Sequence, residues 1–121
     1  MRIGIGILLV AGSLAGCASV PPPVPKSGPE QVRLIDPEVG QEPDEGYRTI
    51  ARVRAVASLG TPVAELTRLL RGEGAAVGAD AVILERVRTT TESEAALMAS
   101  GGQGIVAEGI AIYYPGPDHT L

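Results

Sequence analysis

Two stretches of the chain alternate between two sets of residues, which is the pattern of a half-buried β-strand. In residues 47–57 one side of the predicted strand is formed by Tyr47, Thr49, Ala51, Val53, Ala55 and Ala57, and the other by Arg48, Ile50, Arg52, Arg54 and Val56. In residues 105–114 one side is again rich in small residues, namely Ile105, Ala107, Gly109, Ala111 and Tyr113. We expect one strand in each stretch.

A helix is predicted directly after the first of these strands. Residues 60–62 place a capping residue before a proline, which fits the first helical position. One side of the helix is then formed by Val63, Leu66, Leu70 and Val77, with Leu69 beside them. Gly72 and Gly74 weaken its second half by ~1 kcal/mol each relative to alanine, so a kink or fraying is expected there. Gly78 is a natural terminator.

The apolar run at residues 81–84 and the β-branched residues up to Thr91 predict another strand. Residues 92–104 are expected to form a loop, with one helical turn over residues 93–98 and a mobile tip at residues 100–102. A strand, a helix and a second strand with short connections predict a parallel, right-handed crossover. The expected fold is α+β: a β-α-β-β domain with a three-stranded mixed sheet and one helix on its small-residue face.

The other face of this sheet has no cover in the predicted architecture. It would show Arg48, Ile50, Arg52, Arg54 and Val56 from one strand and Val106, Glu108, Ile110, Ile112 and Tyr114 from another. This mixture is too apolar for a surface without a partner. The candidate interaction face is therefore Arg48, Ile50, Arg52, Arg54, Val56, Ile110 and Ile112, and its cover is a second copy, another envelope protein or the linker.

The first residues are typical of a secretory signal. Arg2 precedes an uncharged stretch, residues 3–20, that is apolar at first and then rich in small residues. Residues 14–17, Leu-Ala-Gly-Cys, resemble the lipobox of bacterial lipoproteins, which implies cleavage after residue 16 and lipidation of Cys17. Ala18 stands where an inner-membrane retention signal would place Asp, which favours the outer membrane, facing the periplasm. The alternative is an uncleaved N-terminal anchor, because the uncharged stretch approaches the ~20 residues that span a bilayer.

Residues 17–46 are predicted to be a disordered tether between the lipid and a domain at residues 47–121. They hold seven of the ten prolines and six acidic residues, which favour an extended chain that lifts the domain away from the bilayer. Residues 32–35 are the one apolar interruption, and they could dock as a short edge strand.

The passage at residues 69–84, a helix followed by Gly-Ala-Asp-Ala-Val, resembles a feature of small bacterial envelope proteins. One such family is the outer-membrane lipoproteins that sense envelope stress for the Rcs pathway, which share the lipobox, the proline-rich tether and a late strand like residues 109–112. The other is the YbjQ-like group, which forms ring oligomers. The resemblance implies the β-α-β-β architecture. The sensors rely on two disulfides, and a chain with one cysteine cannot form them.

Composition excludes several kinds of function. The net charge of −4 and the three tyrosines, without Phe or Trp, argue against nucleic acid as a partner. One cysteine and one histidine, His119, cannot build a typical zinc site. The glycines at 72, 74 and 78 lie within or after a helix, so a phosphate-binding loop is not expected. No nucleophile-elbow sequence surrounds a serine. We expect no enzyme activity, no metal and no cofactor.

The remaining chemistry is a possible cationic stripe formed by Arg48, Arg52, Arg54, Arg86 and Arg88. It could bind an anionic ligand such as lipopolysaccharide, or its side chains could pair with Glu85 and Glu108. The first functional hypothesis is therefore a lipid-anchored envelope protein that acts as a structural or sensory protein-interaction module. The alternative is a binder of small anionic ligands.

Overall fold

The computed structural model describes residues 21–98 and 102–115. The predicted signal peptide, Cys17, most of the predicted loop tip and His119 lie outside the described residues. Two short 3-10 helices precede the main elements, η2 (Pro29–Gln31) and η3 (Pro37–Val39). The strands and helices are β1 (Arg33–Ile35), β2 (Arg48–Ser58), α2 (Val63–Ala76), β3 (Ala81–Thr89), α3 (Glu92–Ala96) and β4 (Gly104–Tyr113).

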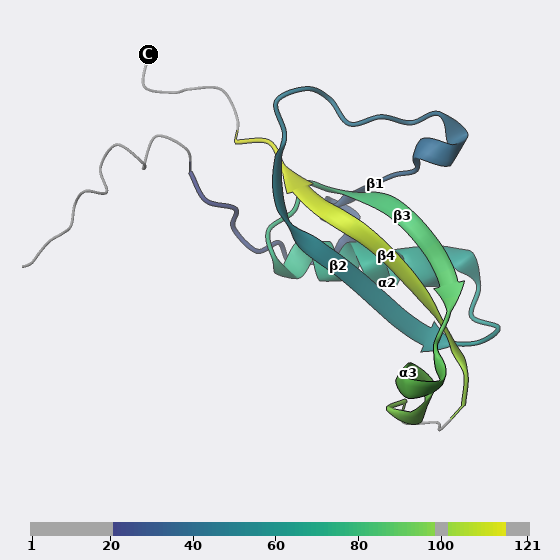
Figure 1. Ribbon diagram of the computed structural model, residues 1–121. Coiled ribbons are helices and arrows are strands. Elements are labelled where there is room, and N and C mark those ends of the chain that lie inside the picture. The colour runs from purple at the N-terminus through teal and green to yellow at the C-terminus, as the bar shows by residue number, and fades with distance from the viewer. Residues whose placement is uncertain (1–20, 99–101, 116–121) are drawn as a thin grey trace, which may run out of the picture.

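The strands form one mixed sheet in the order β1-β3-β4-β2, and α2 packs across one face (Figure 1). β4 is antiparallel to both of its neighbours, β2 and β3, whereas β1 is parallel to β3. β2 and β3, joined through α2, are therefore parallel but separated by β4. The predicted α+β class and the single main helix are confirmed.

The prediction of three strands is wrong, because a fourth strand comes from the segment assigned to the tether. β1 pairs its residues Arg33, Leu34 and Ile35 with residues 81–83 of β3. Val32 and Ile35 are almost fully buried. The apolar interruption in the proline-rich segment thus docks as an edge strand, and residues 21–46 lie on the domain instead of forming an extended tether.

The helix side of the sheet holds the main core. Leu66 and Leu70 are fully buried against small side chains of the sheet, including Ala55, Ala107 and Ala111. Val63, predicted on the same side of the helix, does not join them, because it lies in the first turn and is 61% exposed. Small residues let the helix approach closely, which compensates for the absence of large aromatic side chains.

The end of α2 follows the prediction at Gly78 but not at Gly74. Gly78 has a φ of 87°, and the N–H groups of Gly78 and Ala79 donate to the carbonyls of Ala75 and Gly74 at 3.0 and 2.9 Å. This is the Schellman arrangement that terminates many helices. The helix does not fray at Gly74, which is buried and continues in α2 to Ala76. A Cβ at this position would lie 2.6 Å from Val82 Cγ2, so the helix packs closely against the sheet at Gly74.

A β-bulge at Ile50 changes which residues share a face of the sheet. Thr49 lies opposite Ile112 and Ala51 opposite Ala111, so Ile50 is an extra residue in β2. Ile50 packs against the helix-side core, and Arg48 pairs with Tyr113 on the same side. The predicted positions of Arg48 and Ile50 on the open face are therefore wrong. A simple alternation cannot detect an inserted residue, which reverses the faces of all residues before it.

Candidate interaction surface

The open face of the sheet, the face opposite α2, is divided into an apolar end, a charged centre and a covered end. At the apolar end Ile35, Ala81 and Ile112 are buried, with Ile83, Ile110 and Tyr114 partly buried beside them. The connection from β1 to β2 runs around this end of the sheet (Figure 1), and the Asp44 N–H donates to the Tyr114 hydroxyl at 3.0 Å. Ile112 is therefore not available to a partner, although it belongs to the predicted interaction face.

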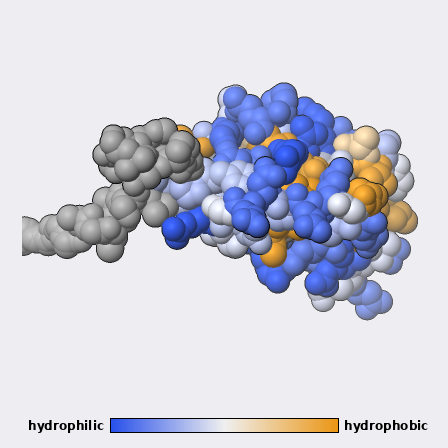
Figure 2. Space-filling view, turned by 90° about the horizontal axis from the view of Figure 1, so that it is seen from above, coloured by the Kyte–Doolittle hydropathy of each residue, from blue (hydrophilic) through white to orange (hydrophobic). Residues whose placement is uncertain are grey.

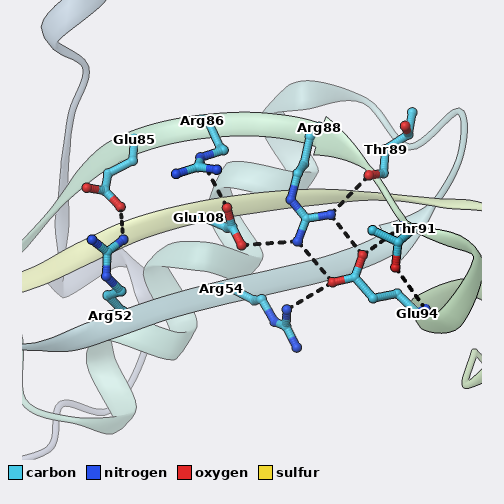
Figure 3. A network of polar contacts seen from close by, with 9 residues as sticks. All are labelled: Arg52, Arg54, Glu85, Arg86, Arg88, Thr89, Thr91, Glu94 and Glu108. Atoms are coloured by element: carbon cyan, nitrogen blue, oxygen red, sulfur yellow. Dashed lines mark hydrogen bonds and ion pairs between the residues drawn. The ribbon is translucent and has the colours of Figure 1, made fainter.

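The centre of the open face is a network of ion pairs (Figure 3). Glu108 on β4 accepts from Arg88 Nη2 at 3.1 Å and contacts Arg86 Nε at 3.3 Å. Arg88 also reaches Glu94, which accepts from Nη1 at 2.8 Å and from Nη2 at 2.9 Å. Arg54 Nη1 donates at 3.0 Å to Glu94 Oε2, the same oxygen that accepts from Arg88 Nη2. The arrangement is a continuous chain, Arg86–Glu108–Arg88–Glu94–Arg54.

A second β-bulge adds one more pair to this surface. The pairing of β3 with β4 shifts between Leu84 and Arg86, which makes Glu85 the extra residue. Glu85 forms an ion pair with Arg52 of β2, across β4. The pairing of arginines with Glu85 and Glu108, one of the two arrangements considered from the sequence, is thus present, and Glu94 joins it. Four arginines of the predicted stripe are engaged, while Arg48 lies on the other face.

Hydrogen bonds within the network shift the pKa values of Glu94, Glu108 and Arg88. Hydrogen bonds from Arg88, and then from the Thr91 N–H, lower the pKa of Glu94 to about 2. A hydrogen bond from Arg88 outweighs partial burial and lowers the pKa of Glu108. The same two carboxylates, Glu94 first, raise the pKa of the Arg88 guanidinium. All three groups therefore remain charged at neutral pH.

Glu94 also fixes α3 over the covered end of the open face. The Thr91 hydroxyl accepts from the Glu94 N–H at 3.2 Å, and the Glu94 carboxylate accepts from the Thr91 N–H at 2.8 Å. This reciprocal capping box begins α3. The helical turn predicted at residues 93–98 is confirmed, one residue early. Val106, on the open face beneath this end, is completely buried.

Hydrogen bonds attach the proline-rich segment to the end of the sheet. Lys26 Nζ donates to Asp80 Oδ1 at 2.5 Å, and its N–H donates to the Ala75 carbonyl at 2.7 Å. Asp80 Oδ2 accepts from the Tyr114 N–H at 2.8 Å. Partial burial raises the pKa of Asp80, but the contacts with Lys26 and Tyr114 outweigh it, so the pKa is lowered. Asp80 therefore joins the segment before β1 to the residue after β4.

The long outer edge of β2 has no partner strand among the described residues, so its backbone N–H and C=O groups on that side are unpaired. β2 is the last strand in the sheet order, and it pairs only with β4 among the described residues. No other backbone group in the described part of the chain bonds to its residues 48–57. The opposite edge is the three-residue strand β1, which lies between two proline-containing 3-10 helices. Among the described residues, β2 offers the longer row of unpaired backbone donors and acceptors, because the other unpaired edge, residues 84–89 of β3 beyond β1, is shorter.

A hollow lies beside β2 on the helix side. It has a volume of about 530 Å³, and its lining combines Val53, Ala76, Val77 and Gly109 with the charged residues Arg52, Arg54, Glu73 and Glu108. The end of α2 and the middle of β2 thus leave a hollow between them with an apolar part and a charged part. The hollow and the free edge meet at the same part of β2.

Residues 21–98 and 102–115 hold no group of three or more His, Cys, Asp or Glu side chains that could bind a metal. Within the same ranges, no helix is long and apolar enough to cross a membrane. Cys17, the predicted lipidation site, lies outside them.

No family model matches the chain, and no match was found among curated proteins or solved structures. The resemblance to envelope-stress sensors and to the YbjQ-like group therefore stays a prediction.

The free edge of β2 and the role of Glu94 were not predicted from the sequence. The order of strands in a sheet depends on long-range pairing, and the alternation within β2 does not reveal whether it lies at the centre or the edge. Glu94 was detectable, because Thr91 and Glu94 have the Thr-x-x-Glu spacing of a capping box.

Proposed function

We propose that this chain is a lipid-anchored protein of the bacterial cell envelope whose folded part is a protein-interaction module, structural or sensory. The observation that carries the proposal is the outer edge of β2, an 11-residue strand with no second neighbour among the described residues. Exposed strand edges of this length pair readily with other polypeptides, and proteins that do not use them usually cover or interrupt them.

The docked proline-rich segment changes how such an anchor would hold the module. Lipidated Cys17 precedes Pro21, the first described residue, by only four positions. A fully extended chain spans at most ~3.6 Å per residue, so the anchor would lie within ~14 Å of Pro21. Tyr113 donates from its hydroxyl to the Pro21 carbonyl at 3.2 Å. In the proposed arrangement the end of the sheet near Tyr113 is held close to the bilayer, and a partner reaches β2 from the periplasm.

Binding of a small anionic ligand through arginines has less support. Arg52, Arg54, Arg86 and Arg88 already contact Glu85, Glu94 or Glu108. A ligand phosphate would have to displace these carboxylates or share their donors. The ion-paired face is better explained as a scaffold that holds β2, β3 and α3 in place.

The anchor is tested by expressing the full chain and its Cys17→Ala variant in bacteria with a radiolabelled fatty acid. We expect label and a processed N-terminus in the parent chain and neither in the variant. An unlabelled, full-length parent chain would contradict the proposed anchor.

The interaction is tested by placing a photocrosslinking amino acid at Ala51 of β2 in intact cells. Ala64, on α2, is the matched control because both alanines are exposed. We expect a discrete protein adduct from position 51 and none from position 64. Equal adducts from both positions, or none from position 51, would contradict a role for the edge.

A further inference from the structure

We propose that β2 binds an extended segment of a partner protein in which acidic and apolar residues alternate, and that this segment adds a fifth strand to the sheet. This inference rests on the proposed interaction function and names the chemistry of the partner. It depends on three features of β2: the backbone of its edge, the arginines on one side and the hollow on the other.

The unpaired backbone groups of β2 would bind an added strand through hydrogen bonds that do not depend on the side chains of the partner. In a strand of 11 residues at the edge of a sheet, every second residue directs its N–H and C=O groups away from the neighbouring strand. An added strand lies about 4.8 Å away and satisfies these groups. The β-bulge at Ile50 interrupts the regular ladder near one end. The regular part of the edge therefore begins at Ala51 and includes Arg52, Val53 and Arg54.

On the open face this regular part carries two exposed positive charges. The side chains of Arg52 and Arg54 are 71% and 53% exposed. Each donates to its glutamate through a single nitrogen, Nη1. A guanidinium has five N–H donors, so each arginine retains donors for another carboxylate. Opposite charges on neighbouring strands stabilise a pair of strands and like charges destabilise it. Acidic side chains are therefore favoured at alternate positions of the partner.

On the helix side the same part of β2 borders the hollow. Val53 lines it from the strand and Ala76 and Val77 line it from the end of α2, while Arg52, Arg54, Glu73 and Glu108 form its charged part. Side chains at the remaining positions of an added strand point to this side of the sheet. An apolar side chain such as Val or Leu there would contact the apolar part of the lining. The two faces together favour a partner in which acidic and apolar residues alternate.

A second copy of the chain is a poor occupant of this edge. β2 contains Arg48, Arg52 and Arg54 and no acidic residue. An antiparallel pair of β2 strands centred on Val53 would place Arg52 of one copy opposite Arg54 of the other. The repulsion of these charges favours a different, acidic partner.

The inference is tested with the purified full chain in detergent and a fluorescent seven-residue probe peptide, Glu-Val-Glu-Val-Glu-Val-Glu, followed by fluorescence anisotropy. The control peptides are the analogue with Lys in place of Glu, a block sequence with the four Glu before the three Val, and the acidic peptide with alternate backbone nitrogens methylated. We expect saturable binding of the alternating acidic peptide and at least tenfold weaker binding of each control.

Arg52→Gln and Arg54→Gln test the charged side of the edge. Each substitution should weaken binding of the acidic peptide about two- to fivefold, which is the size expected for an exposed ion pair. The matched control is Arg68→Gln, because Arg68 also forms an exposed ion pair, with Glu65 on α2. It should leave binding unchanged. The peptide controls need no change in the protein, so the test stands even where a variant folds poorly.

Three outcomes would overturn the inference: equal binding of the acidic and lysine peptides, undiminished binding of the methylated peptide, or a dimer of the free protein that disappears when β2 is blocked. If the acidic peptide fails to bind while Ala51 still crosslinks to a protein in cells, the partner chemistry is wrong and the interaction function stands. If both experiments fail, the proposed interaction function fails as well.

Discussion

Gly72 and Gly74 lie two positions apart in α2 but have different surroundings. A Cβ added at Gly72 meets no atom within 4 Å, whereas one at Gly74 would lie 2.6 Å from Cγ2 of the buried Val82 and 3.4 Å from Val32 Cγ1. Helix propensity treats the two positions alike, and only packing distinguishes them. A comparison of the two positions therefore separates the low helix propensity of glycine from the effect of packing in the core.

We expect opposite effects from alanine at these positions. Gly72→Ala should stabilise the fold by about 0.5–1 kcal/mol, because alanine has the lower entropy cost in a helix. Gly74→Ala should destabilise it by about 1–3 kcal/mol, because the added methyl group overfills a packed contact. Urea unfolding followed by circular dichroism measures both. Equal changes in the free energy of unfolding would mean that α2 does not approach β3 at Gly74.

The lowered pKa of Glu94 makes the free energy of unfolding depend on pH. Its pKa is lowered from 4.5 to about 2 in the folded chain, so the folded state binds the proton less readily than the unfolded state. The resulting stabilisation is complete above pH 4.5 and is lost as the pH falls through about 2. Glu108 and Asp80, whose pKa values are also lowered, act in the same direction.

Glu94→Gln should therefore flatten the decline of unfolding free energy between pH 4.5 and 2, while making the protein less stable at pH 7. The control is Glu92→Gln in the same short helix, because Glu92 is exposed and forms no ion pair with another described residue. Its profile should run parallel to that of the parent chain. A parallel profile for Glu94→Gln would show that Glu94 does not hold α3.

At the scale of elements, β1 depends on a few buried side chains of an otherwise polar segment. Val32 is 1% exposed and packs in the helix-side core, and the Arg71 Nε donates to its carbonyl at 2.8 Å. Figure 2 shows that the surface seen from above is mostly hydrophilic, with smaller hydrophobic areas between. The buried valine thus joins a segment rich in proline and acid to the core of the domain.

Val32→Ala should destabilise the domain by about 1–3 kcal/mol, since it removes buried methyl groups and leaves a cavity. Val24→Ala is the control in the same segment, because Val24 is 69% exposed, and its effect should stay within about 0.5 kcal/mol. Thermal unfolding compares the two variants. If Val32→Ala is as mild as the control, residues 21–46 are a free tether, as the sequence alone suggested.

Local patterns predicted most elements because each has a local cause. Alternation located β2 and β4, proline and glycine bounded α2, and β-branched residues extended β3. The bulges at Ile50 and Glu85 have no such local signal, since they are fixed by pairing with β4. β1 was only a possibility in the sequence, because three residues of strand acquire their stability from the sheet on which they dock.

At the scale of the whole molecule, one edge of the sheet is partly covered and the other is free. β1 covers residues 81–83 of β3, the loop and α3 cover the two ends of the open face, and ion pairs occupy its centre. The longest row of backbone groups left for a partner among the described residues runs along β2. The strand order, and with it the free edge of β2, could not be predicted from charge and composition and required the three-dimensional arrangement.

The most direct test of this account is residue-resolved amide hydrogen exchange along β2 in the full chain without a partner. The account predicts alternation from Arg52 to Ala57: amides bonded to β4 exchange slowly, and those on the outer edge exchange rapidly and become protected when the alternating acidic peptide is added. Uniform protection along β2 in the free protein would contradict it, because the edge would then already be paired.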